Sequence, residues 1–137
     1  MTIRVGINGF GRIGRSFERV LLDRSATIGI EVVALNEPNA DAETLAFLLE
    51  HDSIAGALGM DVETTERGMR VGGQEIAVTH CLEPAEIPWA DHEVDAAHVV
   101  VAALHGLAQR GEINAEIVAA AIDRYGIDTD ALDPRDA

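Results

Sequence analysis

The stretch that decides the fold is IRVGINGFGRIG, residues 3–14. Its first part, 3–7, is a short apolar run, which is consistent with a buried strand. The run continues into GFGRIG, residues 9–14, a complete GxGxxG. A second apolar run over 30–35 ends at Asn36 and Glu37. The order is therefore strand, glycine turn, helix, strand and acidic residue, which is the order of a dinucleotide-binding unit.

The segment between the two apolar runs has the pattern of a helix. Ile13, Phe17, Val20 and Leu21 follow one another at spacings i, i+4, i+7 and i+8. This spacing predicts an apolar stripe on one side of a helix, and we expect that stripe to pack on a sheet.

Each glycine of the motif meets a separate physical demand. Gly9 allows a tight turn, Gly11 lets the backbone approach a pyrophosphate, and Gly14 lets the helix and strand pack closely. The helix N-terminus then offers N–H groups and a partial positive charge to phosphate, and Arg12 is placed to add a charged contact. Glu37 follows the second strand, where a carboxylate bonds ribose hydroxyls and repels a 2′-phosphate. The pattern therefore favours NAD over NADP.

The composition limits the classes of partner. The chain has 137 residues, enough for one domain, and its 47% hydrophobic content supports a core. Its net charge of −14, with ten arginines as the only basic residues besides histidine, predicts no nucleic-acid or anionic-membrane partner. One cysteine cannot form an internal disulfide. We expect a cytoplasmic protein without a metal site, since His98 and His105 alone do not supply a zinc ligand set.

The rest of the chain is expected to close the same domain. Residues 1–95 are expected to be the Rossmann-like dinucleotide-binding unit, with a β-hairpin region in the middle. Residues 96–137 are expected to be an apolar strand or helix segment followed by a C-terminal helix. The apolar run at 97–103 does not distinguish a buried strand from the start of a helix. Asn114 is expected to cap the C-terminal helix and Gly126 to end it.

Five segments, in this order, carry a family resemblance: GINGFGRIGR, VVALNE, TLAFLLEHDS, VGGQEIAVT and PAEIPWAD. Over residues 1 to about 95 the chain resembles the N-terminal half of glyceraldehyde-3-phosphate dehydrogenases. Those enzymes are homotetramers that bind NAD in a Rossmann domain and oxidise an aldehyde through a catalytic cysteine. Glu37 is similar to the glutamate that erythrose-4-phosphate dehydrogenases often carry there. The motif and the resemblance together give the expected cofactor-binding residues, which are Asn8, Gly9, Phe10, Gly11, Arg12, Ile13, Gly14, Asn36 and Glu37.

Departures from the family pattern concern both the cofactor and the chemistry. A family histidine and arginine are replaced by Ala55 and Ala57, and the arginine that approaches the adenine end is replaced by Leu82. The run after Asp95 lacks the Ser/Cys-Thr-Gly loop that lies beside the nicotinamide. The 137 residues contain no Ser-Cys-Thr-Thr-Asn nucleophile segment, so no catalytic residue is assigned and enzymatic activity is left open.

The sequence thus predicts an α/β fold, a shortened Rossmann-like unit with a mostly parallel sheet, a central β-hairpin region and two C-terminal helices. One function hypothesis is a truncated relative that binds NAD or another adenine nucleotide without catalysing alone. The alternative is a non-catalytic interaction or regulatory subunit with vestigial nucleotide binding. It would contact a second copy of itself or a partner enzyme through the C-terminal helices. A third reading is an excised or engineered piece in which the residues after about 95 were replaced.

Overall fold

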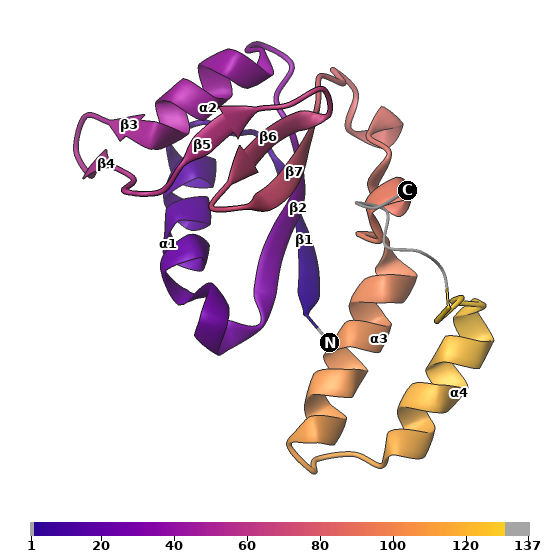
Figure 1. Cartoon of the computed structure of the whole chain (residues 1–137). Helices are drawn as coiled ribbons and strands as arrows, with labels where there is room; N and C mark the ends of the chain where they lie inside the picture. Colours follow the sequence, from indigo (N-terminus) through magenta and orange to yellow (C-terminus); the bar gives the residue numbers. More distant parts are fainter. Residues whose placement is uncertain (1, 131–137) are drawn as a thin grey trace.

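A five-stranded sheet forms the centre of the computed structural model, which describes residues 2–130 without the side chains of 25–28 (Figure 1). The strand order is β1-β2-β7-β6-β5, with β1–β2 and β2–β7 parallel and the last two pairings antiparallel. The strands are β1 (Ile3–Asn8), β2 (Ile30–Asn36), β5 (Val62–Thr64), β6 (Gly68–Val71) and β7 (Gln74–Thr79). A separate two-stranded ladder joins β3 (His51–Asp52) to β4 (Gly56–Ala57).

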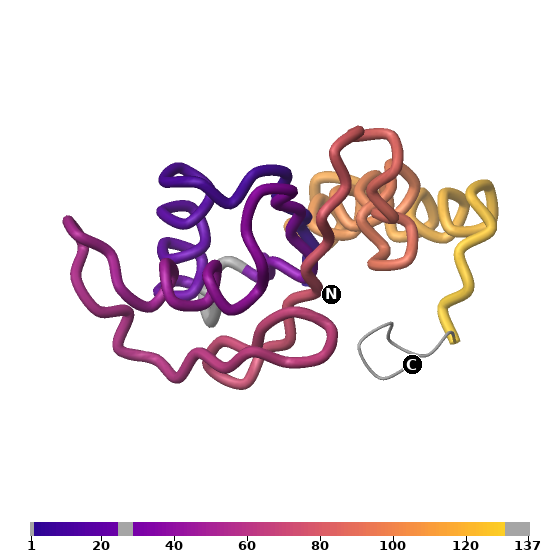
Figure 2. The backbone as a smooth tube through the Cα atoms, turned by 90° about the horizontal axis from the view of Figure 1, so that it is seen from above, coloured from indigo at the N-terminus to yellow at the C-terminus, as the bar shows by residue number. Residues whose placement is uncertain are grey.

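Four α-helices complete the described fold: α1 (Arg12–Ile28), α2 (Ala42–Glu50), α3 (Ala96–Gln109) and α4 (Ala115–Tyr125). Two short 3₁₀ turns, η1 (Pro84–Glu86) and η2 (Trp89–His92), lie between the sheet and α3. The helices α3 and α4 run beside each other, away from α1 and α2, as both views show (Figures 1 and 2). The predicted α/β class, the Rossmann-like arrangement, the β-hairpin region and the two C-terminal helices are confirmed.

The main core lies between the sheet and the helices α1 and α2. Met69 and Val71 of β6 and Ile76 of β7 point into it, since successive strand side chains face opposite sides of a sheet. Val32 and Leu35 of β2 also join it, on either side of the register shift opposite Val5 and Gly6. The fully buried members are Phe10, Val32, Leu35, Leu45, Leu49, Met69, Val71 and Ile76. This core packs beneath the carboxyl ends of the parallel strands.

Helix ends follow the capping residues in the sequence. Asp41 accepts a bond from the N–H of Thr44 at 2.8 Å at the start of α2. Asp95 likewise accepts the N–H groups of Ala97 and His98 at the start of α3. These side-chain acceptors satisfy helix N–H groups that have no acceptor within the helix. The run at 97–103 is therefore the first half of a helix and not a strand.

The predicted C-terminal helix also has the expected ends. Asn114 accepts the N–H of Glu116 at 3.1 Å, and Gly126 adopts the left-handed conformation after the last turn. Residues 131–137 of the expected segment 96–137 lie outside the described residues.

The predicted packing of α1 is wrong on one side of the helix. Ile13, Phe17 and Val20 are 86%, 45% and 51% exposed, whereas Glu18 and Leu21 are buried. The physical reason is that β1 is the edge strand of the described sheet, so the sheet ends before it reaches that side of α1. The apolar stripe of α1 therefore projects beyond β1 and remains exposed to solvent.

The opposite face of β1 is packed by Trp89. A Cβ on Gly6 would overlap the six-membered ring of that side chain, so β1 needs a glycine where η2 crosses it. Nearby, Arg4 on β1 forms an ion pair with Glu93 at 3.0 Å. These contacts attach the segment before α3 to the sheet.

Replacing Gly6 by alanine is expected to lower the free energy of unfolding by about 1–3 kcal/mol, the usual cost of overpacking. The indole of Trp89 must move, and its emission should shift because Trp89 is the only tryptophan. Urea unfolding followed by fluorescence measures both effects. Gly106→Ala is the matched control, since its added Cβ meets nothing within 4 Å and alanine favours a helix. Equal stability of Gly6→Ala and the wild type would contradict this packing.

Candidate functional site

The carboxyl ends of the three parallel strands lie at one edge of the sheet. Backbone bonds join them there: the N–H of Gly9 donates to the carbonyl of Asn36 at 2.8 Å, and the N–H of Glu37 donates to that of Thr79 at 2.9 Å. In open α/β sheets, ligands bind outside this edge. The glycine turn and Glu37, predicted from separate parts of the sequence, are neighbours here.

The glycine turn has the geometry that the motif demands. Gly9 has φ +96°, a conformation that side chains disfavour. A Cβ on Gly14 would overlap the carbonyl oxygen of Gly9, so α1 approaches the turn as closely as only glycine permits. By contrast, a Cβ on Gly11 would meet no protein atom within 4 Å. Gly11 is therefore not required by the packing of the protein itself, and its open side is available to a ligand.

The N-terminus of α1 offers donors to an anion. Gly11 is the N-cap residue and provides no side-chain acceptor, and the first turn contains no acidic residue. The N–H groups of this turn have no intrahelical acceptor and carry the positive end of the helix dipole. Arg12 is exposed beside them, while Arg15 donates to the carbonyl of Phe10 at 3.0 Å and steadies the turn. A phosphate group fits this arrangement of donors.

Glu37 bridges the glycine turn and the loop that follows β2. One carboxylate oxygen accepts the N–H of Phe10 at 3.1 Å, and the other accepts the N–H of Asn39 at 3.2 Å. The second oxygen also accepts the side-chain amide of Asn39 at 3.4 Å. An ionised carboxylate has about four acceptor positions, so the oxygen that accepts the Phe10 N–H keeps capacity for a further donor. The carboxylate is thus oriented by the backbone and can still accept bonds from hydroxyl groups.

The side chain of Asn36 is buried and joins strand ends by hydrogen bonds, so it is not available at the surface for a ligand. Its side chain is 1% exposed. It donates to the side chain of Asn8 and to the carbonyl of Cys81, each at 3.0 Å. It also accepts the N–H of Cys81 at 2.8 Å and the hydroxyl of Thr79 at 2.9 Å. The amide therefore holds the ends of β1, β2 and β7 together.

Phe10 also differs in role from the exposed members of the predicted set. Its side chain is 1% exposed and belongs to the main core, so it contributes only backbone atoms to the edge. Among the other members, Ile13 is open to solvent above the turn. The structure thus brings the nine predicted residues together but buries the side chains of Phe10 and Asn36.

The end of β7 belongs to the same edge, which the sequence reasoning missed. Thr79 and Cys81 bond Asn36, and Nδ1 of His80 lies 2.8 Å from the carbonyl oxygen of Glu37. The alternating pattern of 74–79 could have predicted this position, because it indicates a strand that ends at Thr79. If that strand is parallel to its neighbour, residues 79–81 lie at the same edge of the sheet. Leu82, in the next position, is largely exposed.

A groove continues from the glycine turn along the free side of β1. Its volume is about 510 Å³, and it is lined by Val5, Gly6, Ile7, Asn8, Gly9, Ile13, Gly14 and Phe17. It is open because β1 pairs only with β2 in the described sheet. The site accordingly has a protein wall on one side of the glycine turn and an open edge on the other.

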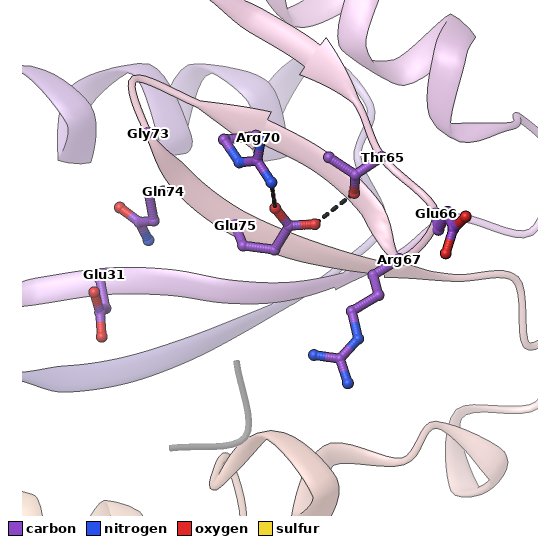
Figure 3. Close-up of a pocket in the computed structure, with 8 residues that line it drawn as sticks. All are labelled: Glu31, Thr65, Glu66, Arg67, Arg70, Gly73, Gln74 and Glu75. Atoms are coloured by element: carbon purple, nitrogen blue, oxygen red, sulfur yellow. Dashed lines mark hydrogen bonds and ion pairs between the residues drawn. The ribbon is translucent and has the colours of Figure 1, made fainter. Parts of the chain in front are cut away.

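The other titratable clusters are occupied by internal contacts. A hollow of about 850 Å³ lies over β6, β7 and the start of β2 (Figure 3). There Arg70 pairs with Glu75 at 3.1 Å, and the hydroxyl of Thr65 donates to the same carboxyl group at 2.5 Å. His98 lies 2.8 Å from the Asp95 carboxylate. Within residues 2–130, no group of three His, Cys, Asp or Glu residues is arranged to hold a metal ion.

The single cysteine shows no nucleophile arrangement. Cys81 is half-buried, and its Sγ contacts the carbonyl oxygen of Glu86 at 3.6 Å. A reactive cysteine needs a base, a cation or a helix N-terminus beside the sulfur.

None of the described helices is long and apolar enough to cross a membrane.

Comparison with known proteins places the sequence of this chain in a family. Residues 3–105 match the family model described as "Glyceraldehyde 3-phosphate dehydrogenase, NAD binding domain". The glyceraldehyde-3-phosphate dehydrogenase of Streptomyces coelicolor is 50% identical over 95 residues, which are 69% of this chain and 27% of that protein. Glyceraldehyde-3-phosphate dehydrogenase 2 of Danio rerio is 35% identical over 140 residues, covering 95% of this chain and 41% of that protein.

A third relative covers the same share of this chain as the first. The glyceraldehyde-3-phosphate dehydrogenase of Mycobacterium avium is 50% identical over 99 residues, which cover 69% of this chain and 29% of that protein. The chain thus spans between about a quarter and two-fifths of the length of these curated relatives.

Proposed function

Because the chain belongs to the family of glyceraldehyde-3-phosphate dehydrogenase NAD-binding domains, we propose that it binds NAD at the glycine turn and does not catalyse aldehyde oxidation by itself. The observation that carries this proposal is the pairing of an uncapped helix N-terminus with an oriented carboxylate. The open space at Gly11 and the free acceptor capacity of Glu37 fit a dinucleotide. A cytoplasmic location remains a prediction from composition.

The protein's own residues divide the work of binding. The first-turn N–H groups of α1 and the guanidinium of Arg12 hold the pyrophosphate, in the manner of helix-terminal phosphate sites. Glu37 accepts the hydroxyls of the adenosine ribose, and the Phe10 and Asn39 N–H groups keep it in place. NAD, when bound, supplies a hydride acceptor. No catalytic role is assigned to Cys81, because its Sγ contacts the carbonyl oxygen of Glu86, a group that does not activate a thiol.

The open edge of β1 determines which half of the ligand is held. Residues 96–109 form α3 and do not extend the sheet beyond β1. The crevice beside the glycine turn therefore has one wall, and the adenosine diphosphate half receives the contacts described above. We accordingly expect ADP-ribose to bind about as tightly as NAD, and nicotinamide mononucleotide to bind far more weakly.

Isothermal titration calorimetry with NAD, ADP-ribose and nicotinamide mononucleotide tests the proposal. Similar dissociation constants for NAD and ADP-ribose, in the micromolar range, are the expected result. A much tighter constant for NAD than for ADP-ribose would contradict the one-walled site. Absence of heat and of a melting shift with both ligands would contradict nucleotide binding altogether.

Replacing Glu37 by glutamine is expected to weaken NAD binding and to improve NADP binding relative to NAD by about tenfold. The reason is that the substitution removes the negative charge that repels a 2′-phosphate while nearly keeping the side-chain volume. Titration of both cofactors measures the ratio. Glu43→Gln, on the exposed first turn of α2, is the control and should leave the ratio unchanged. If the ratio of the NAD and NADP dissociation constants is unchanged in Glu37→Gln, Glu37 does not contact the ribose.

A second candidate function is that of a non-catalytic interaction subunit. It is favoured by the loss of family positions at Ala55, Ala57 and Leu82 and by exposed apolar side chains on α3 and α4, namely Val99, Val100, Ile117 and Tyr125. In this role the Rossmann unit is a scaffold, and the C-terminal helices contact a second copy or a partner enzyme. Isothermal titration calorimetry distinguishes the two functions, because only the first requires NAD and ADP-ribose to bind.

A further inference from the structure

The helices α3 and α4 form a hairpin with a small core of its own. Val101, Val118 and Ala121 are buried between them, apart from the main core. The hairpin extends away from the sheet, with α4 outermost (Figure 1). A pair of helices has only one shared interface, so each helix keeps an outer side that this core does not cover.

One outer side of the hairpin is an apolar groove. Its volume is about 270 Å³, and it is lined mainly by Val100, Leu104, Ile117, Ala120, Arg124 and Tyr125. Ile117 is 47% exposed and Tyr125 is 44% exposed. The members from α4 recur at intervals of three and four residues, so they form one stripe along that helix.

The charge distribution sets this groove apart from the rest of the chain. The whole chain carries a net charge of −14, so two copies repel each other over most of their surface. All 14 residues of α3, in contrast, are free of Asp, Glu, Lys and Arg. The only charged residue lining the groove is Arg124. Two copies can therefore approach here without opposing carboxylates.

The spacing of charges on α4 favours a second copy of the chain as the partner that fills this groove. Ala120 lies in the middle of the stripe, with Glu116 four residues before it and Arg124 four residues after it. All three are exposed. If two α4 helices cross antiparallel with Ala120 at a two-fold axis, Arg124 of each copy falls opposite Glu116 of the other. This stripe is self-complementary, as a two-fold interface requires.

We propose that this groove is the contact between two copies of the chain, which pair antiparallel through α4 about Ala120. The small Ala120 side chain lets the helices approach, and Ile117 enters the groove of the other copy beside Val100 and Leu104. Arg124, whose guanidinium lies 6.0 Å from the centre of the Tyr125 ring, closes the rim against Glu116 of the second copy. This contact rests on the second candidate function, to which it gives a second copy as the partner, and it does not depend on nucleotide binding.

Charge reversal with light scattering and sedimentation tests the pairing. The wild type should be a dimer that dissociates on dilution. Arg124→Glu alone and Glu116→Arg alone should each raise the dissociation constant at least about tenfold, because each creates two like-charge contacts per dimer. Ile117→Glu should give a folded monomer, since Ile117 contributes little to the hairpin core. A wild type that is monomeric at all concentrations would overturn the proposal.

Mixing the two reversed variants gives the sharper result. In a heterodimer of Arg124→Glu with Glu116→Arg, both rim contacts join opposite charges again, so the mixture should associate more tightly than either variant alone. Labelled copies of each variant measure this directly, and circular dichroism checks that both remain helical. A mixture no tighter than its components would overturn the antiparallel register. Gly11→Val should dimerise like the wild type, which separates this outcome from any failure of nucleotide binding.

Discussion

Glu18→Gln is expected to be more stable than the wild type at about pH 8, by at most about 3 kcal/mol. Glu18 lies on the buried side of α1 and is 1% exposed. Its Oε2 atom has no hydrogen-bond partner in the described part of the chain. Burial raises the pKa of this carboxyl group from 4.5 to about 7. A difference of roughly 2.5 pKa units corresponds to about 3 kcal/mol.

The sign of the pH dependence follows from where the proton is bound. Between pH 4.5 and about 7 the unfolded chain loses the proton from Glu18 while the folded protein keeps it. The folded state is therefore progressively destabilised as pH rises through this range, and the effect levels off above about pH 7. The neutral amide of the variant has no such dependence, so the stabilities of the two proteins should converge near pH 4.5.

Urea unfolding at several pH values measures this difference. Exposed Glu66 provides the control, and Glu66→Gln should follow the wild-type stability throughout. A stability difference between Glu18→Gln and the wild type that does not change with pH would show that Glu18 is already ionised in the folded protein.

Gly11→Val is expected to weaken NAD binding at least about 100-fold with the fold intact, equivalent to about 2.7 kcal/mol. Gly11 has φ −72°, which valine adopts, and the added Cβ meets no protein atom within 4 Å. The side chain then stands beside the first-turn N–H groups, where the pyrophosphate binds in the proposed complex. Titration calorimetry and the shift in melting temperature on adding NAD measure the loss.

Gly14→Ala gives the informative contrast within the same motif. Its Cβ overlaps the backbone oxygen of Gly9, so this variant should lose stability as well as binding. Gly106→Ala should lose neither. Equal melting shifts with NAD for the wild type and Gly11→Val would mean that the ligand does not approach the turn.

Much of the fold could be predicted because local sequence carries it. The order of strand, glycine turn, helix and strand is confirmed. So are the helix cap at Asn114 and the helix end at Gly126. These features depend on a few neighbouring residues: on the steric freedom of glycine and on side-chain acceptors for the first N–H groups of a helix. The position of Glu37 beside the turn follows too, because parallel strands end at the same edge.

The side of α1 that is buried could not be predicted in this way. The stripe through Phe17 has the correct helical period but faces out past β1, while Glu18 is turned inward. Helical periodicity predicts that one side of a helix will be covered, without indicating how far the sheet extends beneath it. Whether β1 has a further neighbour depends on residues beyond 95, where the run at 97–103 has no period that separates strand from helix.

The sequence by itself therefore determined the glycine turn and the capped C-terminal helix, since each depends on contacts between residues close along the chain. It also determined that Glu37 lies beside the turn, because parallel strands end at the same edge of a sheet. Only the tertiary structure decided that β1 is an edge strand, that Asn36 ties three strands together and that the hairpin of α3 and α4 keeps an open groove. These properties arise from contacts between segments 28 to 89 residues apart and from which surfaces remain uncovered once those contacts form.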